Sequence, residues 1–354
     1  MRFGWLTLAH SPAPEADEGE IFNLLDQACL AETLGFDGVW LTEHNFTGES
    51  VYSDPIPFAA ALAMRTNRIR IGFAVIQMAL RHPVRLATQL SLLDNLCRGR
   101  LDIGVGRGSI FNEYEYLGYG LRSDDARDRM IEALDIMMRA WTDTPLDHKG
   151  RFYSVSLPEL RPVPVQKPHP PVWHSVVSPP SFEFCGKAGV PILTVRLPTH
   201  LLKDRLGLYA KGLAESGLDA AVQRARLESA ALWRWIYVGE SRAEAEDTFV
   251  AMLKETREHM GHARDTLNPP DFQIPSTLLN PWTDTVVSEE EGIRFALANG
   301  TIIGTVDDVA EQFAELKAAG IGHVLAQMSF GYLGHERIRA SMRRFGEKII
   351  PRFK

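Results

Sequence analysis

The sequence predicts a (β/α)8 TIM barrel that spans all 354 residues as one domain. Short apolar runs alternate with amphipathic helical patterns eight times without a shift in composition, which is typical of a parallel barrel. The apolar run at residues 39–41 is followed at once by the polar residues Thr42, Glu43, His44 and Asn45, as expected where a strand reaches the catalytic end of a barrel. A doubly wound sheet is the alternative, but it needs fewer strands and leaves the last third of the chain unexplained.

The expected strands are short runs of β-branched, aliphatic and aromatic residues. They cover residues 3–9, 39–41, 69–77, 101–106, 172–177, 191–195, 230–238 and 323–329. The expected helices show an apolar face or a terminal signal, such as Pro83 in a first turn or Thr305 as an N-cap. They cover residues 18–34, 55–64, 83–96, 124–141, 181–187, 199–216, 242–260, 306–319 and 336–350.

Three segments interrupt this alternation. Residues 147–154 predict a hairpin-like excursion, and the proline-rich residues 158–171 predict an extended surface run. Residues 261–299 contain Asn-Pro-Pro and Asn-Pro-Trp, so we expect an insertion with little regular structure before the last strand–helix unit. Long loops of this kind act as mobile lids over active sites.

Composition and charge restrict the class of protein. The chain is 45% hydrophobic and 23% charged, which is ordinary for a globular protein. Its net charge of −7 argues against nucleic acid or an anionic membrane surface as a partner. No apolar run approaches the roughly 20 residues of a transmembrane helix, and no signal peptide is evident. The three cysteines and the histidines lack metal-ligand spacing, so we expect a cytoplasmic protein without a metal site.

The segment at residues 100–109 ends an expected strand in three glycines around Arg107. Glycines let the backbone approach a ligand closely, and a guanidinium suits a phosphate or carboxylate. The segment has neither the Lys-Ser/Thr ending of a phosphate-binding loop nor a dinucleotide fingerprint within a βαβ unit. A glycine-rich turn with a surface arginine explains it equally well.

A set of motifs in a fixed order carries a resemblance that covers nearly the whole chain. The motifs are Glu43-His44-Asn45-Phe46, residues 72–76, His82-Pro83-Val84-Arg85, Leu92-Leu93-Asp94, Gly99-Arg100, residues 104–108, Leu117-Gly118, residues 164–173, residues 178–181 and Gly304-Thr305. In these motifs the sequence resembles the bacterial luciferase-like, flavin-dependent monooxygenases. The resemblance implies a barrel that binds reduced FMN at its C-terminal mouth and reacts with O2 through a flavin 4a-hydroperoxide to oxidise a small organic substrate. It also implies a partner flavin reductase and a homodimer built on the second and third barrel helices.

The resemblance also assigns roles to individual residues. His44 matches the catalytic histidine beside the isoalloxazine ring, where a near-neutral pKa suits proton transfer, and Glu43 is expected to orient its surroundings. Ala74 and Val75 match a non-prolyl cis peptide behind the flavin. The residues that match cofactor contacts are Ala74, Val75, Gly106, Arg107, Ser178 and Ser181. The two serines match phosphate contacts where a helix N-terminus offers backbone donors, although Ser181 also fits a plain N-cap.

Three positions depart from the light-emitting members of that family. Asn45 replaces a histidine, Gly106 replaces a cysteine near the ring, and Val195 replaces a tryptophan. These departures argue against light emission and against a long-chain aldehyde substrate.

The substrate pocket is the least defined part of the expected site. Its candidates, which fit barrel packing equally well, are Thr7, His10, Phe111, Tyr114, Val195, Trp233 and Trp235. Two other functions stay open. One is a deazaflavin-dependent dehydrogenase or reductase on the same barrel, which passes hydride and needs no O2. The other is a non-catalytic flavin-binding accessory subunit.

Overall fold

Eight parallel strands close into a barrel in the computed structural model, which describes residues 1–8, 10–273 and 288–354. Around the barrel they are β1 (Arg2–Thr7), β2 (Gly38–Leu41), β3 (Arg70–Phe73), β5 (Leu101–Gly106), β8 (Val172–Val176), β9 (Ile192–Thr194), β10 (Ala231–Val238) and β12 (His323–Ser329). β12 pairs with both β10 and β1, which closes the ring. The expected (β/α)8 barrel is confirmed.

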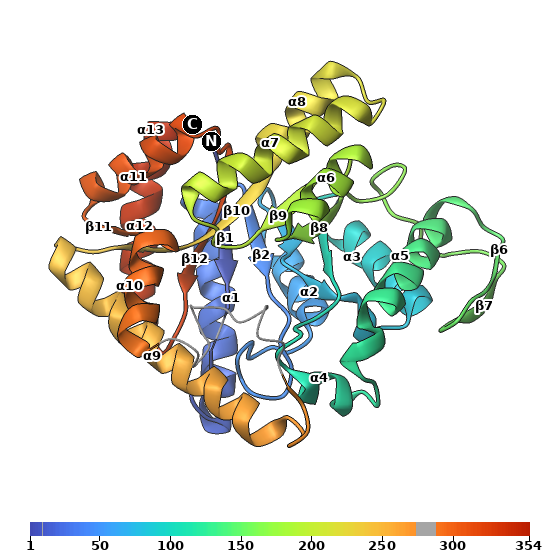
Figure 1. Cartoon of the computed structure of the whole chain (residues 1–354), viewed down its shortest axis with the longest axis horizontal. Coiled ribbons are helices and arrows are strands. Elements are labelled where there is room, and N and C mark those ends of the chain that lie inside the picture. Colours follow the sequence, from blue (N-terminus) through green and yellow to red (C-terminus); the bar gives the residue numbers. More distant parts are fainter. Residues whose placement is uncertain (9, 274–287) are drawn as a thin grey trace.

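Helices surround the barrel (Figure 1). The helices that the sequence predicted are present, with ends shifted by a few residues in most cases. They are α1 (Asp17–Thr33), α2 (Pro55–Arg65), α3 (Pro83–Leu96), α5 (Ala126–Thr142), α6 (Pro179–Lys187), α7 (Thr199–Glu215), α9 (Arg242–Leu267), α11 (Val306–Ala318) and α12 (His335–Arg344). Both termini lie at the N-terminal end of the barrel, whereas α4 (Glu113–Gly118) lies at the opposite end (Figure 1).

The expected strand at residues 69–77 is divided in two. A cis peptide bond joins Ala74 to Val75, and β3 stops before it while β4 (Ile76–Gln77) resumes after it. Both pieces pair with β5, so the chain bends at this point without leaving the sheet. The hairpin expected near residues 147–154 is confirmed as β6 (Leu146–Lys149) and β7 (Ser154–Leu157), which pair antiparallel.

The expected insertion at residues 261–299 is more regular at both ends than the sequence indicated. At its start, α9 continues past Gly261 to Leu267, because a single glycine costs a helix only about 0.5–1 kcal/mol. At its end, α10 (Glu289–Asn299) begins with a capping box in which Ser288 and Glu291 bond reciprocally. Residues 274–287, the rest of the expected lid, lie outside the described residues.

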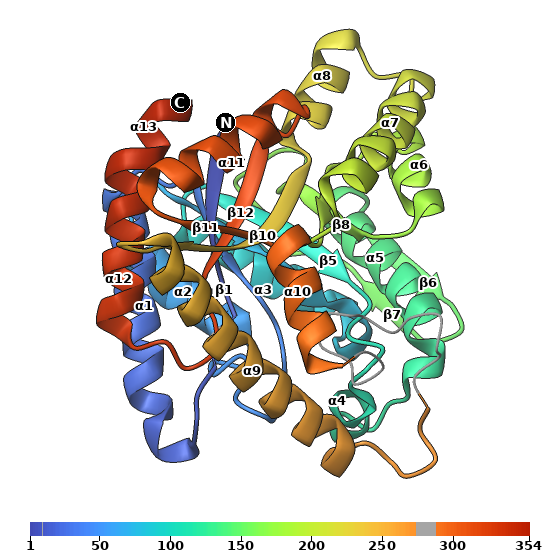
Figure 2. The same ribbon diagram turned by 60° about the vertical axis from the view of Figure 1, so that its left-hand side comes forward.

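Besides α4 and α10, three further helices and strands were not expected from the sequence. They are α8 (Ala220–Ser229), β11 (Thr301–Gly304) and α13 (Ile350–Phe353). β11 pairs with the second half of β10, beyond the part of β10 that pairs with β12. In Figure 2, α9 and α10 lie over this side of the barrel. Helices α9 and α10 pack against β11 there.

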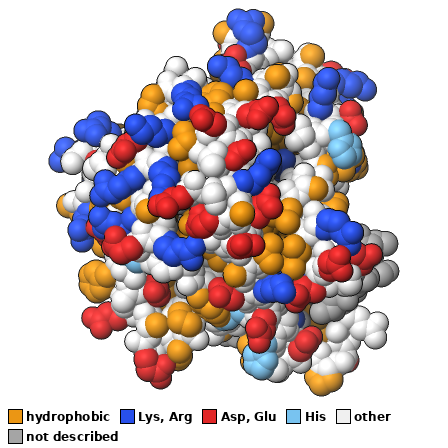
Figure 3. All heavy atoms as spheres, turned by 90° about the vertical axis from the view of Figure 1, so that its left-hand side faces the viewer, with side chains coloured by type: hydrophobic (Ala, Val, Ile, Leu, Met, Phe, Trp, Pro, Cys, Tyr) orange, Lys and Arg blue, Asp and Glu red, His pale blue; other side chains and the backbone are white. Residues whose placement is uncertain are grey.

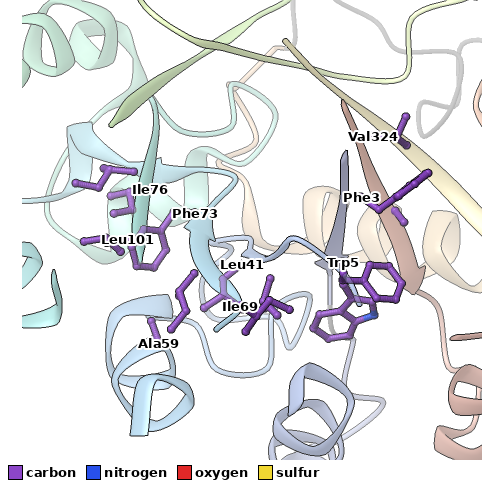
Figure 4. Close-up of a cluster of buried hydrophobic side chains, with 14 of the residues drawn as sticks. Phe3, Trp5, Leu41, Ala59, Ile69, Phe73, Ile76, Leu101 and Val324 are labelled. Carbon is purple, nitrogen blue, oxygen red and sulfur yellow. The ribbon is translucent and has the colours of Figure 1, made fainter. Parts of the chain in front are cut away.

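The main apolar core lies between the strands and the surrounding helices (Figure 4). Phe3 and Trp5 on β1, Leu41 on β2 and Phe73 on β3 are fully buried there against helix residues such as Ala59. Alternate residues of each strand face outward to this layer and inward to the barrel axis. The outward-facing residues of the strands therefore hold the helices against the barrel.

The interior of the barrel is filled around the indole of Trp40. Trp40 meets Trp173 edge to face, with ring centroids 5.4 Å apart. Glycines on the flanking strands make room for this side chain: a Cβ atom on Gly4 would lie 2.5 Å from Trp40 Cδ1, and one on Gly72 would lie 2.6 Å from Trp40 Cδ2. The barrel is thus a packed core whose chemistry must lie at one end.

The surface that includes α9 to α12 carries acidic and basic side chains in an interspersed pattern (Figure 3). No helix among the described residues is both long and apolar enough to cross a membrane.

Candidate active site

The C-terminal ends of the strands bring the polar residues after β2 into a buried cluster. Thr42, Glu43 and Asn45 are almost fully buried, and the side chain of His44 keeps 24% of its surface exposed. Thr42 Oγ1 donates to the carbonyl oxygen of Thr7 at 3.0 Å, which ties the end of β2 to the end of β1. His44 is therefore the residue of this run that faces the accessible side.

Two carboxylates hold the imidazole of His44. Its Nδ1 lies 3.3 Å from Glu115 Oε1, and its Nε2 lies 3.5 Å from Glu49 Oε1. Both carboxylates are buried. Burial by itself lowers the pKa of His44, but the charge of Glu49 and the hydrogen bond with Glu115 outweigh it and raise the pKa to about 9. The near-neutral pKa expected from the sequence is therefore wrong, and His44 is an imidazolium at neutral pH.

Glu115 is the centre of a buried hydrogen-bond network. Its carboxylate accepts from Asn112 Nδ2 at 2.7 Å, from Gln77 Nε2 at 2.6 Å and from Asn45 Nδ2 at 3.4 Å. Burial raises the pKa of Glu115, but the hydrogen bond with His44 and the amide donors outweigh it, and the net direction is downward. Glu115 is accordingly ionised and fixes the orientation of His44.

Glu43 supports this network from the next position in the chain. Its carboxylate accepts from the backbone N–H of Gln77 at 2.9 Å and from Arg81 Nη2 at 2.7 Å, and Arg81 continues to Asp54 at the surface. Burial raises the pKa of Glu43 to about 7 in spite of Arg81. The orienting role expected for Glu43 agrees with these contacts. Glu43 binds the backbone of Gln77, and the side chain of Gln77 donates to Glu115.

The residues that match ring contacts lie at the ends of β3 and β5. Ala74 and Val75 form the cis peptide and pack against the barrel interior, and a Cβ on Gly106 would lie 2.6 Å from Val75 Cγ2. Gly108 has φ +111°, and a Cβ there would lie 2.6 Å from Gln77 Oε1, so both features require glycine. The backbone after β5 therefore passes closely beside the turn at residues 74–75.

The residues that match phosphate contacts lie after the adjacent strands β5 and β8. Arg107 is exposed and makes no ion pair with any described residue, and partial burial lowers the pKa of its guanidinium. Ser178 Oγ lies 2.6 Å from Ser181 Oγ at the start of α6. Pro179 and Pro180 have no N–H, and the N–H groups of Ser181 and Phe182 donate to the Ser178 carbonyl. The donors at this helix start are thus the serine hydroxyls rather than the backbone amides that the sequence led us to expect.

Unpartnered polar atoms mark the strand ends as a place for a ligand. Thr7, Gln77 and Thr194 are the last residues of β1, β4 and β9, and the side-chain oxygen of each is buried without a hydrogen bond within the described structure. His10 Nε2 is in the same state. Buried polar atoms are normally paired, so a cluster of exceptions fits a site that receives polar ligand atoms. The side-chain oxygens of Gln77 and Thr194, together with Arg107 and the two serines, fit a flavin with a terminal phosphate.

The candidate pocket residues fall into two groups. Phe111 and Tyr114 lie beside the His44 network, where Asn268 of the segment after α9 accepts from the Tyr114 N–H and donates to the Phe111 carbonyl. Trp233 and Trp235 lie on β10, and the guanidinium of Arg196 lies 4.1 Å and 3.8 Å from their ring centroids. Val195 follows β9, and His10 and Thr7 follow or end β1. All seven therefore belong to the C-terminal side of the barrel.

Several contributors to this site were not identified from the sequence. They are Glu49, Gln77, Arg81, Asn112, Glu115 and Arg196. Among these residues, only Gln77 could have been singled out from the sequence, because it is the last residue of an expected strand. Glu115 lies in the short helix α4, where two carboxylates among aromatic residues read as an ordinary exposed turn. Its burial depends on α4 folding over the barrel mouth, which no local pattern indicates.

Fold and site define an α/β-barrel enzyme with a carboxylate-held imidazolium at the C-terminal mouth. A family model described as luciferase-like monooxygenase matches residues 1–323, and the chain belongs to that family. It is an oxidoreductase, as the family's named members are. The oxygenase component of a flavin-dependent trigonelline monooxygenase from Acinetobacter baylyi is 24% identical over 100% of this chain and 96% of its own length.

Two solved structures have folds similar to that of this chain. A monooxygenase from Streptomyces bottropensis is 25% identical, with a TM-score of 0.81 over 100% of both chains. An F420-dependent secondary alcohol dehydrogenase is 20% identical, with a TM-score of 0.74 over 100% of this chain and 99% of that one. The second likeness concerns the fold alone, and it shows that this barrel by itself does not decide between cofactors.

Proposed function

We propose that this protein is a flavin-dependent monooxygenase that uses reduced FMN and O2 to oxidise a small organic substrate. The observation that carries the proposal is the imidazolium of His44, held by Glu115 and Glu49 beside strand ends with unpartnered polar atoms. When bound, reduced flavin supplies two electrons to O2, so that one oxygen atom enters the substrate and the other leaves as water. Family membership and the flavin dependence named for the Acinetobacter relative support this choice.

The chain's own residues supply binding and a proton. Arg107, Ser178 and Ser181 would hold the phosphate, and the turn at Ala74 and Val75 would lie behind the ring. His44 Nε2 makes the longer of the two carboxylate contacts, so its proton is the more available one. His44 therefore acts as a proton donor to an oxygen atom at the site. Glu115 stabilises the charge of the imidazolium before the transfer and keeps the ring in position after it.

Supply of reduced flavin by a separate reductase follows from the same proposal. The Acinetobacter relative is named an oxygenase component. The described residues of this chain show one barrel and no second nucleotide-binding fold. We therefore expect a transient encounter with a flavin reductase rather than a stable complex.

The proposed function is tested by anaerobic titration with reduced FMN, followed by exposure of the complex to O2. We expect saturable binding and a reoxidation rate that differs from that of free reduced FMN. His44→Gln should bind reduced FMN within about threefold of wild type, because it retains the shape, but should change reoxidation by about 10²-fold or more, the usual contribution of a positioned acid. His82→Gln, at an exposed position at the start of α3, is the control and should match wild type.

The alternatives predict different results in the same experiment. A deazaflavin-dependent dehydrogenase would bind the reduced deazaflavin, fail to bind reduced FMN and turn over a substrate without O2. An accessory subunit would bind FMN but leave its reoxidation unchanged in wild type and in His44→Gln. Either result rejects the monooxygenase assignment.

We also propose a homodimer formed through α2 and α3. Met64 on α2 and Leu92 and Leu96 on α3 are exposed apolar side chains. Val163 lies beside them, because Asn95 Nδ2 donates to its carbonyl oxygen at 2.8 Å, and it is also exposed. Because α2 and α3 pack side by side, exposed apolar side chains on both helices favour burial against a second copy of the chain.

A further inference from the structure

His10 lies on the side of the barrel mouth away from the proposed cofactor residues. Around the barrel, β3, β5 and β8 carry the proposed cofactor residues, and β2 carries His44. Beyond β2 come β1 and β12, and His10 follows β1 where the loop after β12 meets it. His44 thus lies between the cofactor side and the side that His10 occupies. That second side is therefore adjacent to His44 and lies away from the proposed cofactor residues.

The hydrogen bonding of His10 fixes its tautomer. The backbone N–H of Gly331 donates to His10 Nδ1 at 3.1 Å, so Nδ1 must keep its lone pair. The proton of the neutral ring is therefore on Nε2. His10 is 5% exposed, and burial, followed by the nearby His259 and His44, lowers its pKa to about 3. His10 is a neutral ring with a single donor, Nε2–H.

That donor has no acceptor within the described structure. Among the described residues, His259 on α9, at 5.6 Å between ring centroids, and Tyr332, at 6.3 Å, meet His10 edge to face. His259 Nδ1 and the Tyr332 hydroxyl bond each other at 2.9 Å, and His259 Nε2 is itself buried without a hydrogen bond, so neither ring satisfies His10. A metal ion is not the missing partner, because His10 Nε2 could offer a lone pair only by giving up the Gly331 bond.

We propose that His10 Nε2–H donates a hydrogen bond to a neutral carbonyl oxygen of the substrate and thereby selects carbonyl compounds. This inference rests on the proposed function, since it names the substrate class of the same site. An uncharged donor matches an uncharged acceptor, whereas a buried anion would need an opposite charge at the same point. Glu255 accepts from the Tyr332 N–H at 3.0 Å, which places negative charge on this side and disfavours an anionic group.

The test compares two probes that differ in the acceptor alone. Acetophenone carries a carbonyl oxygen, and α-methylstyrene has a CH2 group in its place with nearly the same shape. Binding of each to the full chain is measured by calorimetry. Because a buried donor left unpaired is costly, we expect wild type to bind the ketone about tenfold or more tightly than the alkene. His10→Phe should bring this ratio near one, and His10→Gln, which retains an N–H donor, should keep part of it.

Three results would overturn the proposal: no measurable binding of the ketone to wild type, a wild-type ratio near one, or an unchanged ratio in His10→Phe. His10→Phe also deprives the Gly331 N–H of its acceptor, so its fold is checked by circular dichroism. If it does not fold, 15N NMR of wild-type histidines decides the case, because the His10 Nε2–H resonance must shift with the ketone and not with the alkene.

Reduced-FMN binding separates this inference from the proposed function. His10→Phe should bind reduced FMN as wild type does. A loss of FMN binding in this variant would place His10 among the cofactor contacts and reject a substrate role. If wild type binds no reduced FMN while the ketone preference holds, the monooxygenase assignment fails and the carbonyl site at His10 stands.

Discussion

His44 Nδ1 and Glu115 Oε1 lie 3.3 Å apart, although 71 positions separate the two residues in the chain. The contact joins the end of β2 to α4, and it is the shorter of the two carboxylate contacts that make His44 an imidazolium. The protonation state of the catalytic candidate is therefore set by a helix that the sequence did not reveal.

Removing that carboxylate should return His44 toward ordinary behaviour. In Glu115→Gln the hydrogen bond can persist, but the charge is lost. We expect the pKa of His44 to fall from about 9 toward the ordinary value of about 6.5. Titration of the His44 ring by NMR measures this directly. Glu113→Gln is the matched control, since Glu113 is buried on the same helix and contacts Arg122 rather than His44. An equal shift in both variants would contradict the specific role of Glu115.

The same ion pairs predict a dependence of stability on pH. The pKa of His44 is higher in the folded protein than in the unfolded chain, so its protonation stabilises the fold. This contribution is fully present below about pH 6.5 and is lost as the pH rises through about 9. Denaturant unfolding across this range should show the loss in wild type and a flatter profile in His44→Gln. Parallel profiles would show that His44 is not the group responsible.

The pair formed by Glu43 and Arg81 predicts an asymmetry between single and double substitutions. Arg81→Met leaves the buried carboxylate of Glu43 without its cation and should cost about 3–5 kcal/mol of unfolding free energy. Adding Glu43→Gln removes the buried charge and should restore part of that loss. Denaturant unfolding of wild type, both single variants and the double variant measures the coupling. Simple additivity of the two single effects would show that the pair is not coupled.

The packing around Trp40 predicts opposite effects for two glycine substitutions. Gly72→Ala would place a Cβ 2.6 Å from Trp40 Cδ2, and overpacking of this kind typically costs about 1–3 kcal/mol. In Gly261→Ala the new Cβ meets nothing within 4 Å on helix α9, so we expect a gain of about 0.5–1 kcal/mol. Thermal unfolding of the two variants provides the comparison. A neutral Gly72→Ala would show that the barrel interior can adjust.

The proposed dimer predicts a change in mass. Leu92→Glu places a charge among the exposed apolar groups of α2 and α3 and should convert a dimer to a monomer in light scattering after size exclusion. Phe22→Glu, on α1, is equally exposed and should leave the mass unchanged. Wild type that elutes as a monomer at all concentrations would reject the dimer.

Much of the fold was accessible from the sequence, because each barrel strand and each long helix has its own periodic pattern. The elements that were missed depend on partners. β11 forms only because the second half of β10 offers it an open edge, and α4 is too short to show a periodic face. At residues 261–299, the prolines predicted little regular structure, but Ser288 caps the start of helix α10 there.

The candidate site, like the fold, could be predicted from the sequence only in part. His44 could be identified because it follows a strand directly, and the matching motif names it. The charge of His44 could not be predicted, because Glu49 and Glu115 contact its ring from other segments of the chain. No sequence pattern around either residue distinguishes a buried carboxylate from an exposed one. The lone donor on His10 likewise depends on the Gly331 N–H, 321 positions away.

The indole of Trp40 also determines how molecules travel. Because Trp40 and its neighbours close the barrel axis, nothing that enters at the C-terminal mouth can leave through the other end. A cofactor, a substrate, oxygen and a product must therefore all enter and leave on the C-terminal side of the barrel.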